Sequence, residues 1–222
     1  MLEDMGFMSE LLTGLNRGLV MSVQLIVPSA IGGMLIGVVT GALRAFGNRL
    51  VSKIGDGYAA LFRGTPLVVQ LFVLYFGLPN IGIYFSPYWA AVTCFILCSG
   101  AYQSEYVRGA LLSIKKNQYF GAQALGFTKL QTIVWIIIPQ AMRRALPGCG
   151  NEIVYLIKYS SLAYVVTVME LTGEGKTVAT EYFRFTEVFL VIGIYYLILV
   201  SIAKLILAKM EQVFHVPGFG RG

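Results

Sequence analysis

Charge is scarce in this chain. Charged residues make up only 13% of its 222 residues, whereas hydrophobic residues make up 57%. Soluble domains carry about 25% charged residues, because their surfaces must stay in water. The shortage of charge therefore excludes an ordinary soluble domain and predicts a chain that lies mostly in a lipid bilayer.

Residues with reactive side chains are equally few. The chain has one histidine, His215 near its end, and three cysteines. Cys94 and Cys98 are four residues apart within an apolar segment, and Cys149 stands alone. Because no zinc-binding spacing and no set of nucleophile, histidine and acid is visible, we expect neither a catalytic site nor a metal site.

One segment, GEGKT at Gly173–Thr177, looks like the end of a phosphate-binding loop. A Walker A motif requires a glycine five residues before Gly175, but this chain has Glu170 there, and no strand pattern precedes it. We therefore expect no cofactor in this chain. Any work driven by ATP would need a separate subunit that holds ATP and Mg²⁺.

Five apolar segments are long enough to be membrane-spanning helices, since a span needs about 20 residues. They are residues 19–43, 65–83, 88–111, 152–170 and 188–208. In the first, Gly33 and Gly37 are small residues of the kind that allows helices to pack closely. The pattern predicts an all-α membrane protein, with one domain over residues 1–222 and five transmembrane helices.

The cations of the chain indicate its orientation. With the N-terminus outside, the inner segments hold 13 of the 17 Lys and Arg residues, the outer segments hold 3, and Lys158 lies within a span. This asymmetry follows the positive-inside rule and places the C-terminus in the cytoplasm. Residues 44–63 then form an inner loop, whose middle we expect to lie as a short helix on the membrane surface. The net charge of +6 is spread over several loops, so we expect no nucleic-acid partner.

The inner segment of residues 113–151 carries five Lys or Arg residues and no acidic residue. Its first part favours a helix, which Gly126 is suited to end in a left-handed cap. A helical spacing of apolar residues resumes at Leu130, and Pro139 and Pro147 are expected to mark the next turns. The segment thus reads as a cytoplasmic helix-turn-helix that docks a partner.

Two stretches of this segment carry a resemblance to a known family. The spacing GAxxxG at residues 121–126, followed by IxIP at residues 136–139, resembles the EAA loop of ABC importer permeases. The sequence of residues 139–165 is similar to the polar amino acid branch of that family, the histidine, glutamine and arginine type. The similarity extends from about Gly41 to Met210.

The loop departs from the family pattern at two positions. Phe120 stands where the family usually has glutamate, and Gly121 stands where it usually has alanine. The departure leaves open which polar contact, if any, the loop makes with the ATPase. By resemblance, the residues that couple this chain to an ATPase are Phe120, Gly121, Ala122, Leu125, Gly126 and Phe127.

The resemblance implies the membrane subunit of an importer in a prokaryotic cell membrane. Two permeases, identical or paralogous, would form the pathway for a polar amino acid. Two ATPase subunits would bind the EAA loops, and an extracytoplasmic binding protein would deliver the substrate. The sequence does not say which amino acid is carried, or whether the pathway has a specific site of its own.

Polar residues within the predicted spans are candidates for the pathway. Lys158 is the clearest, because a lysine near the centre of a membrane helix costs about 2.5–3.5 kcal/mol on insertion scales. An ammonium group that simply reaches the headgroups is an equal alternative. The candidate pathway residues are Glu105, Glu152, Lys158, Ser160, Ser161 and Tyr164. Gln24 and Gln70 are weaker candidates, because a single amide often serves only to join helices.

Two other functions fit a membrane chain of this kind. A secondary transporter or channel would use an ion gradient, with the inner loop as a regulatory site. Against it, the chain shows no pair of broken helices in matching halves. A scaffold without transport activity would use the loop only to recruit a cytoplasmic protein.

Overall fold

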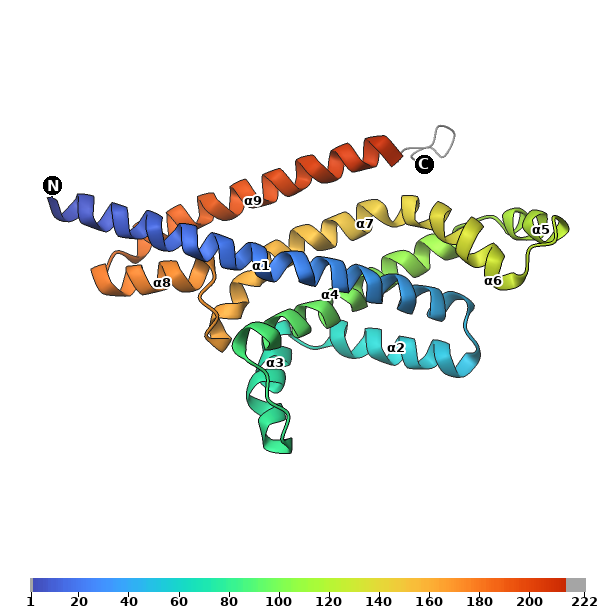
Figure 1. Cartoon of the computed structure of the whole chain (residues 1–222), viewed down its shortest axis with the longest axis horizontal. Helices are drawn as coiled ribbons and strands as arrows, with labels where there is room; N and C mark the ends of the chain where they lie inside the picture. Colours follow the sequence, from blue (N-terminus) through green and yellow to red (C-terminus); the bar gives the residue numbers. More distant parts are fainter. Residues whose placement is uncertain (1, 215–222) are drawn as a thin grey trace.

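The computed structural model describes residues 2–214, so His215 lies outside the described residues, and within them the chain is helical without a strand (Figure 1). This confirms the predicted all-α class. The elements are α1 (Leu2–Phe46), α2 (Arg49–Gly64), α3 (Leu67–Phe72), η1 (Val73–Gly77), η2 (Leu78–Ile81), α4 (Pro87–Leu112), α5 (Lys116–Ala124), α6 (Lys129–Gln131), η3 (Thr132–Ile137), α7 (Ile138–Tyr159), η4 (Ser160–Val166), α8 (Leu171–Tyr182) and α9 (Phe185–Phe214).

Helices α1 and α4 form the central pair, and glycines of α1 set their close approach. A Cβ atom at Gly37 would lie 2.6 Å from the Cβ atom of Gln103, and one at Gly33 would lie 2.9 Å from Ser99. Real Cβ atoms do not come that close, so these two positions accept only glycine without a shift. The predicted role of these glycines in helix packing is confirmed.

Helix α2 lies along the bundle. Asn48 begins it, because its side-chain oxygen accepts a hydrogen bond from the backbone N–H of Val51 at 2.9 Å. The buried face of α2 contains Gly55 and Ala59, and the Tyr58 hydroxyl donates to the carbonyl of Leu97 on α4 at 2.6 Å. The predicted helix in this segment is present, with one side buried against α1 and α4, and its position on the membrane surface stays a prediction.

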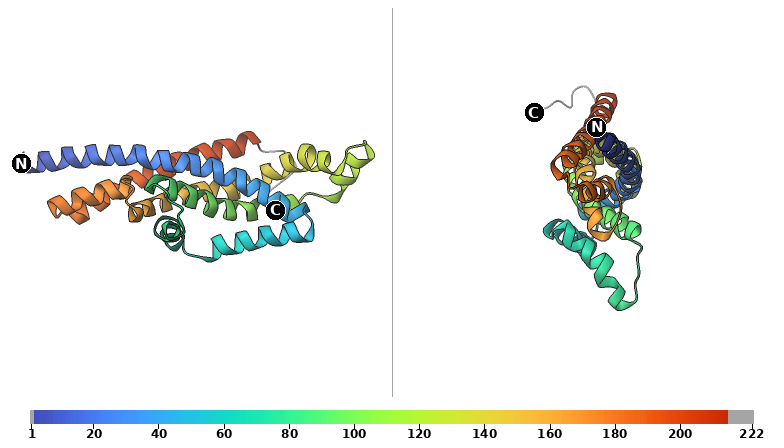
Figure 2. Two further views of the ribbon diagram at one scale, coloured as in Figure 1. Left: turned by 60° about the horizontal axis from the view of Figure 1, so that its bottom comes forward. Right: turned by 90° about the vertical axis from the view of Figure 1, so that its left-hand side faces the viewer.

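The second apolar segment does not continue as one straight helix. Elements α3, η1 and η2 follow α2 after a bend of 104°, and they project from the bundle as a short arm (Figures 1 and 2). The Gln70 side chain closes the bend by donating to the carbonyls of Phe62 at 2.8 Å and Thr65 at 3.0 Å. The arm, Leu67–Ile81, is about 22 Å long at 1.5 Å per residue, shorter than a bilayer core.

Helix α7 begins earlier than the sequence indicates. It runs from Ile138 to Tyr159, with Pro139 in its first turn and Pro147 inside it. The expectation that these prolines mark turns was wrong. A proline inside a helix costs about 3 kcal/mol, and here the packing of α7 against α4 through Ala141 and Ala145 holds the helix together.

The segment between the fourth and fifth predicted spans, residues 171–187, is folded. It contains α8, whose buried residues pack with the first turns of α1 and with α9 in a separate apolar cluster. Ion pairs reinforce this end of the chain, since Arg17 lies 3.4 Å from Glu174 and Arg184 lies 2.7 Å from Asp4. Helix α1 consequently extends well before residue 19, the predicted start of the first span.

Two described helices are long and apolar enough to cross a membrane, Asp4–Phe46 and Phe185–Phe214. The number rises to four if each of two bent pairs, Arg49–Gly64 with Leu67–Ile81 and Lys129–Val166 with Leu171–Tyr182, counts as one span. Helix α4 is in neither group; it is largely buried among the other helices and carries Glu105 and Arg108. The predicted number of five spans therefore stays a prediction.

Candidate functional site

The element formed by α5, α6 and η3, residues 116–137, lies at one end of the elongated molecule (Figure 1). Helix α5 ends in a Schellman motif, in which Phe127 N–H donates to Ala122 O at 3.2 Å and Gly126 N–H donates to Gln123 O at 2.9 Å. Gly126 has φ of +88°, a conformation that side chains other than glycine rarely adopt. The left-handed cap expected at Gly126 is present.

A second local motif begins the next helix. The Thr128 hydroxyl accepts from Gln131 N–H at 3.3 Å, and the Gln131 side chain accepts from Thr128 N–H at 2.9 Å. This capping box satisfies two donors that the helix start would otherwise leave unpaired. The turn between α5 and α6 is thus fixed on both sides by hydrogen bonds, and η3 joins it to α7 without a break.

The predicted ATPase-coupling residues differ in exposure. Phe120 is 61% exposed and Leu125 is 81% exposed, and Phe127 is also exposed. Ala122 is buried and faces the rest of the element. Gly121 has open space around its Cα, and Gly126 makes the turn. This element therefore exposes apolar side chains, which form a surface suited to binding in a groove of another protein.

Sequence reasoning missed two further residues of this surface. Leu130 and Trp135 are 71% and 70% exposed, on α6 and η3. Their apolar character was visible, and the helical spacing from Leu130 onward indicated an apolar face. Ile133 and Ile137 of the same segment are buried, so the sequence did not show which of its apolar side chains point outward.

The predicted pathway residues are not brought together as one group. Glu152 is buried, and its carboxylate accepts a hydrogen bond from the Tyr159 hydroxyl at 2.9 Å. Lys158 is exposed, and its ammonium group lies 4.2 Å from the ring centre of Tyr155. Neither Glu105 nor Glu152 forms an ion pair with Lys158 among the described residues.

The three other candidates belong to η4. The hydroxyls of Ser160 and Ser161 donate to carbonyls three residues before them, those of Ile157 and Lys158. The Tyr164 ring lies 5.0 Å from the Lys176 ammonium group on α8. These hydroxyls are therefore engaged within the last turns of the helix, as expected of polar groups in an apolar environment.

Helix α7 nevertheless has a polar exposed face. Asn151, Tyr155 and Lys158 are all exposed and follow one another at intervals of four and three residues, which places them on one side of the helix. On α1 and α9, by contrast, the exposed side chains are mostly large and apolar. In a membrane protein, a polar face points to water or to another protein and not to lipid.

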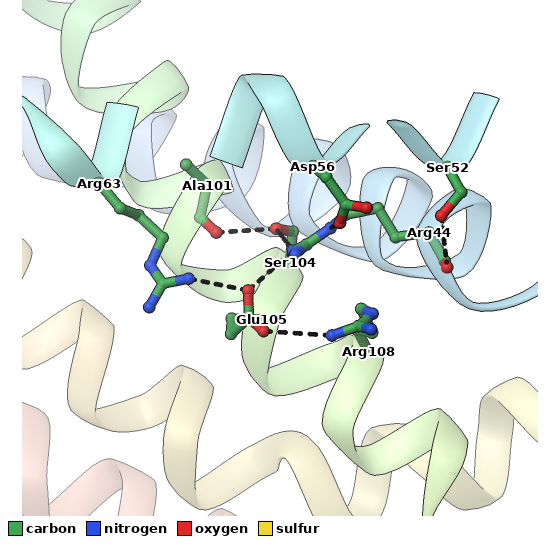
Figure 3. Close-up of polar contacts among 8 residues, drawn as sticks. All are labelled: Arg44, Ser52, Asp56, Arg63, Ala101, Ser104, Glu105 and Arg108. Atoms are coloured by element: carbon green, nitrogen blue, oxygen red, sulfur yellow. Dashed lines mark hydrogen bonds and ion pairs between the residues drawn. The ribbon is translucent and has the colours of Figure 1, made fainter. Parts of the chain in front are cut away.

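Glu105 lies at the centre of an ion-pair network on α4 (Figure 3). Its carboxylate lies 2.8 Å from Arg63, 2.9 Å from Arg44 and 3.4 Å from Arg108. Arg44 has a nearly buried side chain and also bonds to Asp56 at 2.8 Å. Glu105 was predicted to be a pathway residue. It pairs with Arg108 and joins α1, α2 and α4.

A buried carboxylate directly before α8 was missed by the sequence reasoning. Glu170 is fully buried and accepts hydrogen bonds from Thr172 N–H, Gly173 N–H and the Tyr196 hydroxyl. It therefore caps α8, and the GEGKT segment is part of that helix. A carboxylate before a helix start is a signal that the sequence did contain.

Known proteins resemble the chain over most of its length. Residues 33–214 match the family model of the binding-protein-dependent transport system inner membrane component. The chain is 36% identical to the glutamine transport system permease protein of Escherichia coli K12, over 89% of this chain and 91% of that protein. It is 33% identical to the arginine transport system permease protein of Bacillus subtilis 168, over 88% of this chain and 90% of that protein.

A solved structure agrees with these relatives. The crystal structure of an amino acid ABC transporter with histidines superposes with a TM-score of 0.83 and 26% identity, covering 92% of this chain and 96% of that one. The match of sequence and fold thus extends over nearly the whole chain. The chain belongs to the family of inner membrane components of binding-protein-dependent transport systems.

Proposed function

We propose that this chain is the membrane-spanning permease subunit of an ATP-driven, binding-protein-dependent importer of polar amino acids. Family membership supports a transport subunit, and the relatives named for glutamine and arginine support the substrate class. The proposal leaves open which amino acid is transported, because the relatives of this chain are named for different amino acids.

The proposed assembly contains the partners that the family pattern implies. Two ATPase subunits hold ATP and Mg²⁺, and a second permease, a copy or a paralogue, completes the pathway. An extracytoplasmic binding protein delivers the amino acid to the outer side of a prokaryotic cell membrane. The chain has five spans, with its N-terminus outside, and it hydrolyses no ATP itself.

The surface of the α5–η3 element is the single observation that carries the proposal. Its apolar side chains Phe120 and Leu125 are exposed, Phe120 on α5 and Leu125 at the start of the turn that hydrogen bonds fix from both sides. Exposed apolar groups of this size are stabilised by burial in a partner. Because η3 leads directly into α7, movement of a docked ATPase is passed to a helix of the bundle.

The polar face of α7 is the best candidate for the pathway wall. Asn151, Tyr155 and Lys158 lie exposed on α7, whose first residue follows directly on the element that carries the docking surface. ATP binding would move the docked ATPases together, and the two permeases would exchange inward for outward opening. Such coupling requires that both ends of α7 make different contacts in the two states.

Uptake by sealed vesicles tests the proposal. The chain, purified with its native ATPase, is reconstituted with the binding protein, and accumulation of labelled glutamine, arginine and histidine is measured. We expect accumulation that requires ATP on the ATPase side and the binding protein on the other. Accumulation driven by an ion gradient without ATP would favour a secondary transporter, and no accumulation would favour a scaffold.

A further inference from the structure

The α5–η3 element leaves the bundle at the end of α4 and returns to it in α7. A polar contact joins the residue at which the chain leaves α4 to the first turns of α7. The Arg144 guanidinium, on α7, donates from one nitrogen to the carbonyl of Ser113 at 2.8 Å and to its hydroxyl at 2.9 Å. Ser113 is the C-terminal cap of α4, so this contact joins the two ends of the segment that holds the docking surface.

The position of Ser113 makes the contact strong. The last carbonyls of a helix have no partner within the helix, and the end of the helix carries partial negative charge. A guanidinium supplies both a positive charge and fixed donors, and such charge-assisted hydrogen bonds are about twice as strong as neutral ones. The Ser113 hydroxyl also donates to Ala110 O at 2.7 Å, which holds it in place for Arg144.

Few other polar contacts cross from α7 to the start of the element. Gln140 donates to the Gln118 side chain on α5 at 3.4 Å, a long hydrogen bond between exposed groups. Apolar residues of α4 and α7, such as Leu111 and Ala141, also pack together in this region. Apolar surfaces resist separation but allow one helix to slide along another, whereas a hydrogen-bonded pair fixes their register.

Beyond Ser113, helix α4 leads to the ion-pair network. Glu105 lies about two turns before the end of α4 and holds Arg44 of α1 and Arg63 of α2. A displacement that reaches the end of α4 is thus passed to three helices. Without the Arg144 contact, the ends of α4 and α7 would be joined here mainly by apolar packing, which does not fix their register.

We propose that Arg144 is a positioning residue that makes α4 and α7 move together when the α5–η3 element is displaced. The proposal rests on the proposed function, because it assumes that an ATPase moves this element. Arg144 acts through Ser113 and touches no substrate. Its removal uncouples the two activities of the complex, so that ATP is hydrolysed without matching transport.

The adjacent residue Arg143 provides a matched control. It has the same charge and lies in the same turn of α7, but it is exposed and makes no hydrogen bond or ion pair among the described residues. Any effect of losing one positive charge from this surface is therefore shared by Arg143→Ala. Only Arg144→Ala also removes the contact with Ser113.

The test compares wild type, Arg143→Ala, Arg144→Ala and Arg144→Lys in the full complex, with ATPase, second permease and binding protein, in proteoliposomes. ATP hydrolysis and uptake are measured on the same vesicles and expressed as amino acid carried per ATP. We expect Arg144→Ala to lower this ratio about fivefold or more, a typical size for coupling between two sites. Arg143→Ala keeps the wild-type ratio, and Arg144→Lys recovers part of it because an ammonium can still donate to Ser113.

A purely structural role gives a different result. Amounts of assembled complex, uptake and hydrolysis would then fall together in Arg144→Ala, with the ratio unchanged, and the proposal would be overturned. If Arg144→Ala fails to assemble, the ratio in Arg144→Lys and Ser113→Gly decides in the same way. Absence of ATP-driven uptake in wild type would instead contradict the proposed function itself.

Discussion

The Arg63 guanidinium lies 2.8 Å from the carboxylate of Glu105, and this pair joins the last turn of α2 to α4 directly before the chain bends by 104°. The same carboxylate neutralises Arg44, whose side chain is only 6% exposed. Glu105 therefore stabilises the arrangement of α1, α2 and α4. This role in the bundle accounts for the residue without a contact to substrate.

Replacing Glu105 by glutamine tests that role. The amide cannot neutralise three guanidinium groups, and loss of hydrogen bonds to charged groups costs about 1.5–3 kcal/mol. We expect the melting temperature of the detergent-solubilised chain to fall by about 3–10 °C. Glu181→Gln is the control, because Glu181 is exposed on α8 and makes no hydrogen bond or ion pair among the described residues. Equal melting temperatures of the two variants would contradict a central role for Glu105.

The turn at Gly126 gives a second prediction. Alanine there must adopt φ near +88°, which costs about 1–2 kcal/mol for a residue with a Cβ atom. Gly121→Ala is the matched change, since Gly121 lies inside α5 with open space around it, and alanine favours a helix. Hydrogen exchange of residues 116–131 is expected to become faster in Gly126→Ala and slower or unchanged in Gly121→Ala. Faster exchange in both would show that the turn does not depend on the left-handed glycine.

Local rules made these parts of the chain predictable. The cap at Gly126 depends on one residue and its neighbours, and the role of Gly33 and Gly37 depends only on the lack of a side chain. Helical content follows from long apolar segments, because a chain in lipid must satisfy its backbone polar groups internally. Each of these features depends on a short stretch of consecutive residues.

The features that the sequence did not predict depend on residues far apart in the chain. Pro147 is accepted inside α7 because α4 packs against that helix, which no local pattern indicates. Glu105 finds Arg44 and Arg63 only once α1, α2 and α4 are side by side. The bend after α2 is likewise held by Gln70, whose amide was visible while its acceptors were not.

The exposed ring of Phe120 gives a third prediction. If the α5–η3 surface binds an ATPase, truncation of this ring removes apolar contact area, and the few residues that dominate an interface each contribute more than about 1 kcal/mol. We expect Phe120→Ala to weaken binding of the purified ATPase about fivefold or more. Phe183→Ala is the control, because Phe183 is 83% exposed and ends α8, at the opposite end of the chain (Figure 1). If both variants bound the ATPase with equal affinity, the ATPase would have to bind a different surface of this protein.

The polar face of α7 gives the last prediction, which separates a water-filled pathway from a lipid-facing surface. Cysteine reacts with polar thiol reagents as the thiolate, which forms in water and not in lipid. Tyr155 on α7 is 51% exposed and Ile198 on α9 is 52% exposed, so the two positions are equally uncovered in the single chain. In the assembled complex in membranes, we expect Tyr155→Cys to react with a membrane-impermeant reagent and Ile198→Cys to stay unreacted. The three native cysteines are buried, which keeps the background reaction low. Protection of Tyr155→Cys by the transported amino acid would place α7 in the pathway, whereas failure of both positions to react would mean that lipid or the second permease covers this face.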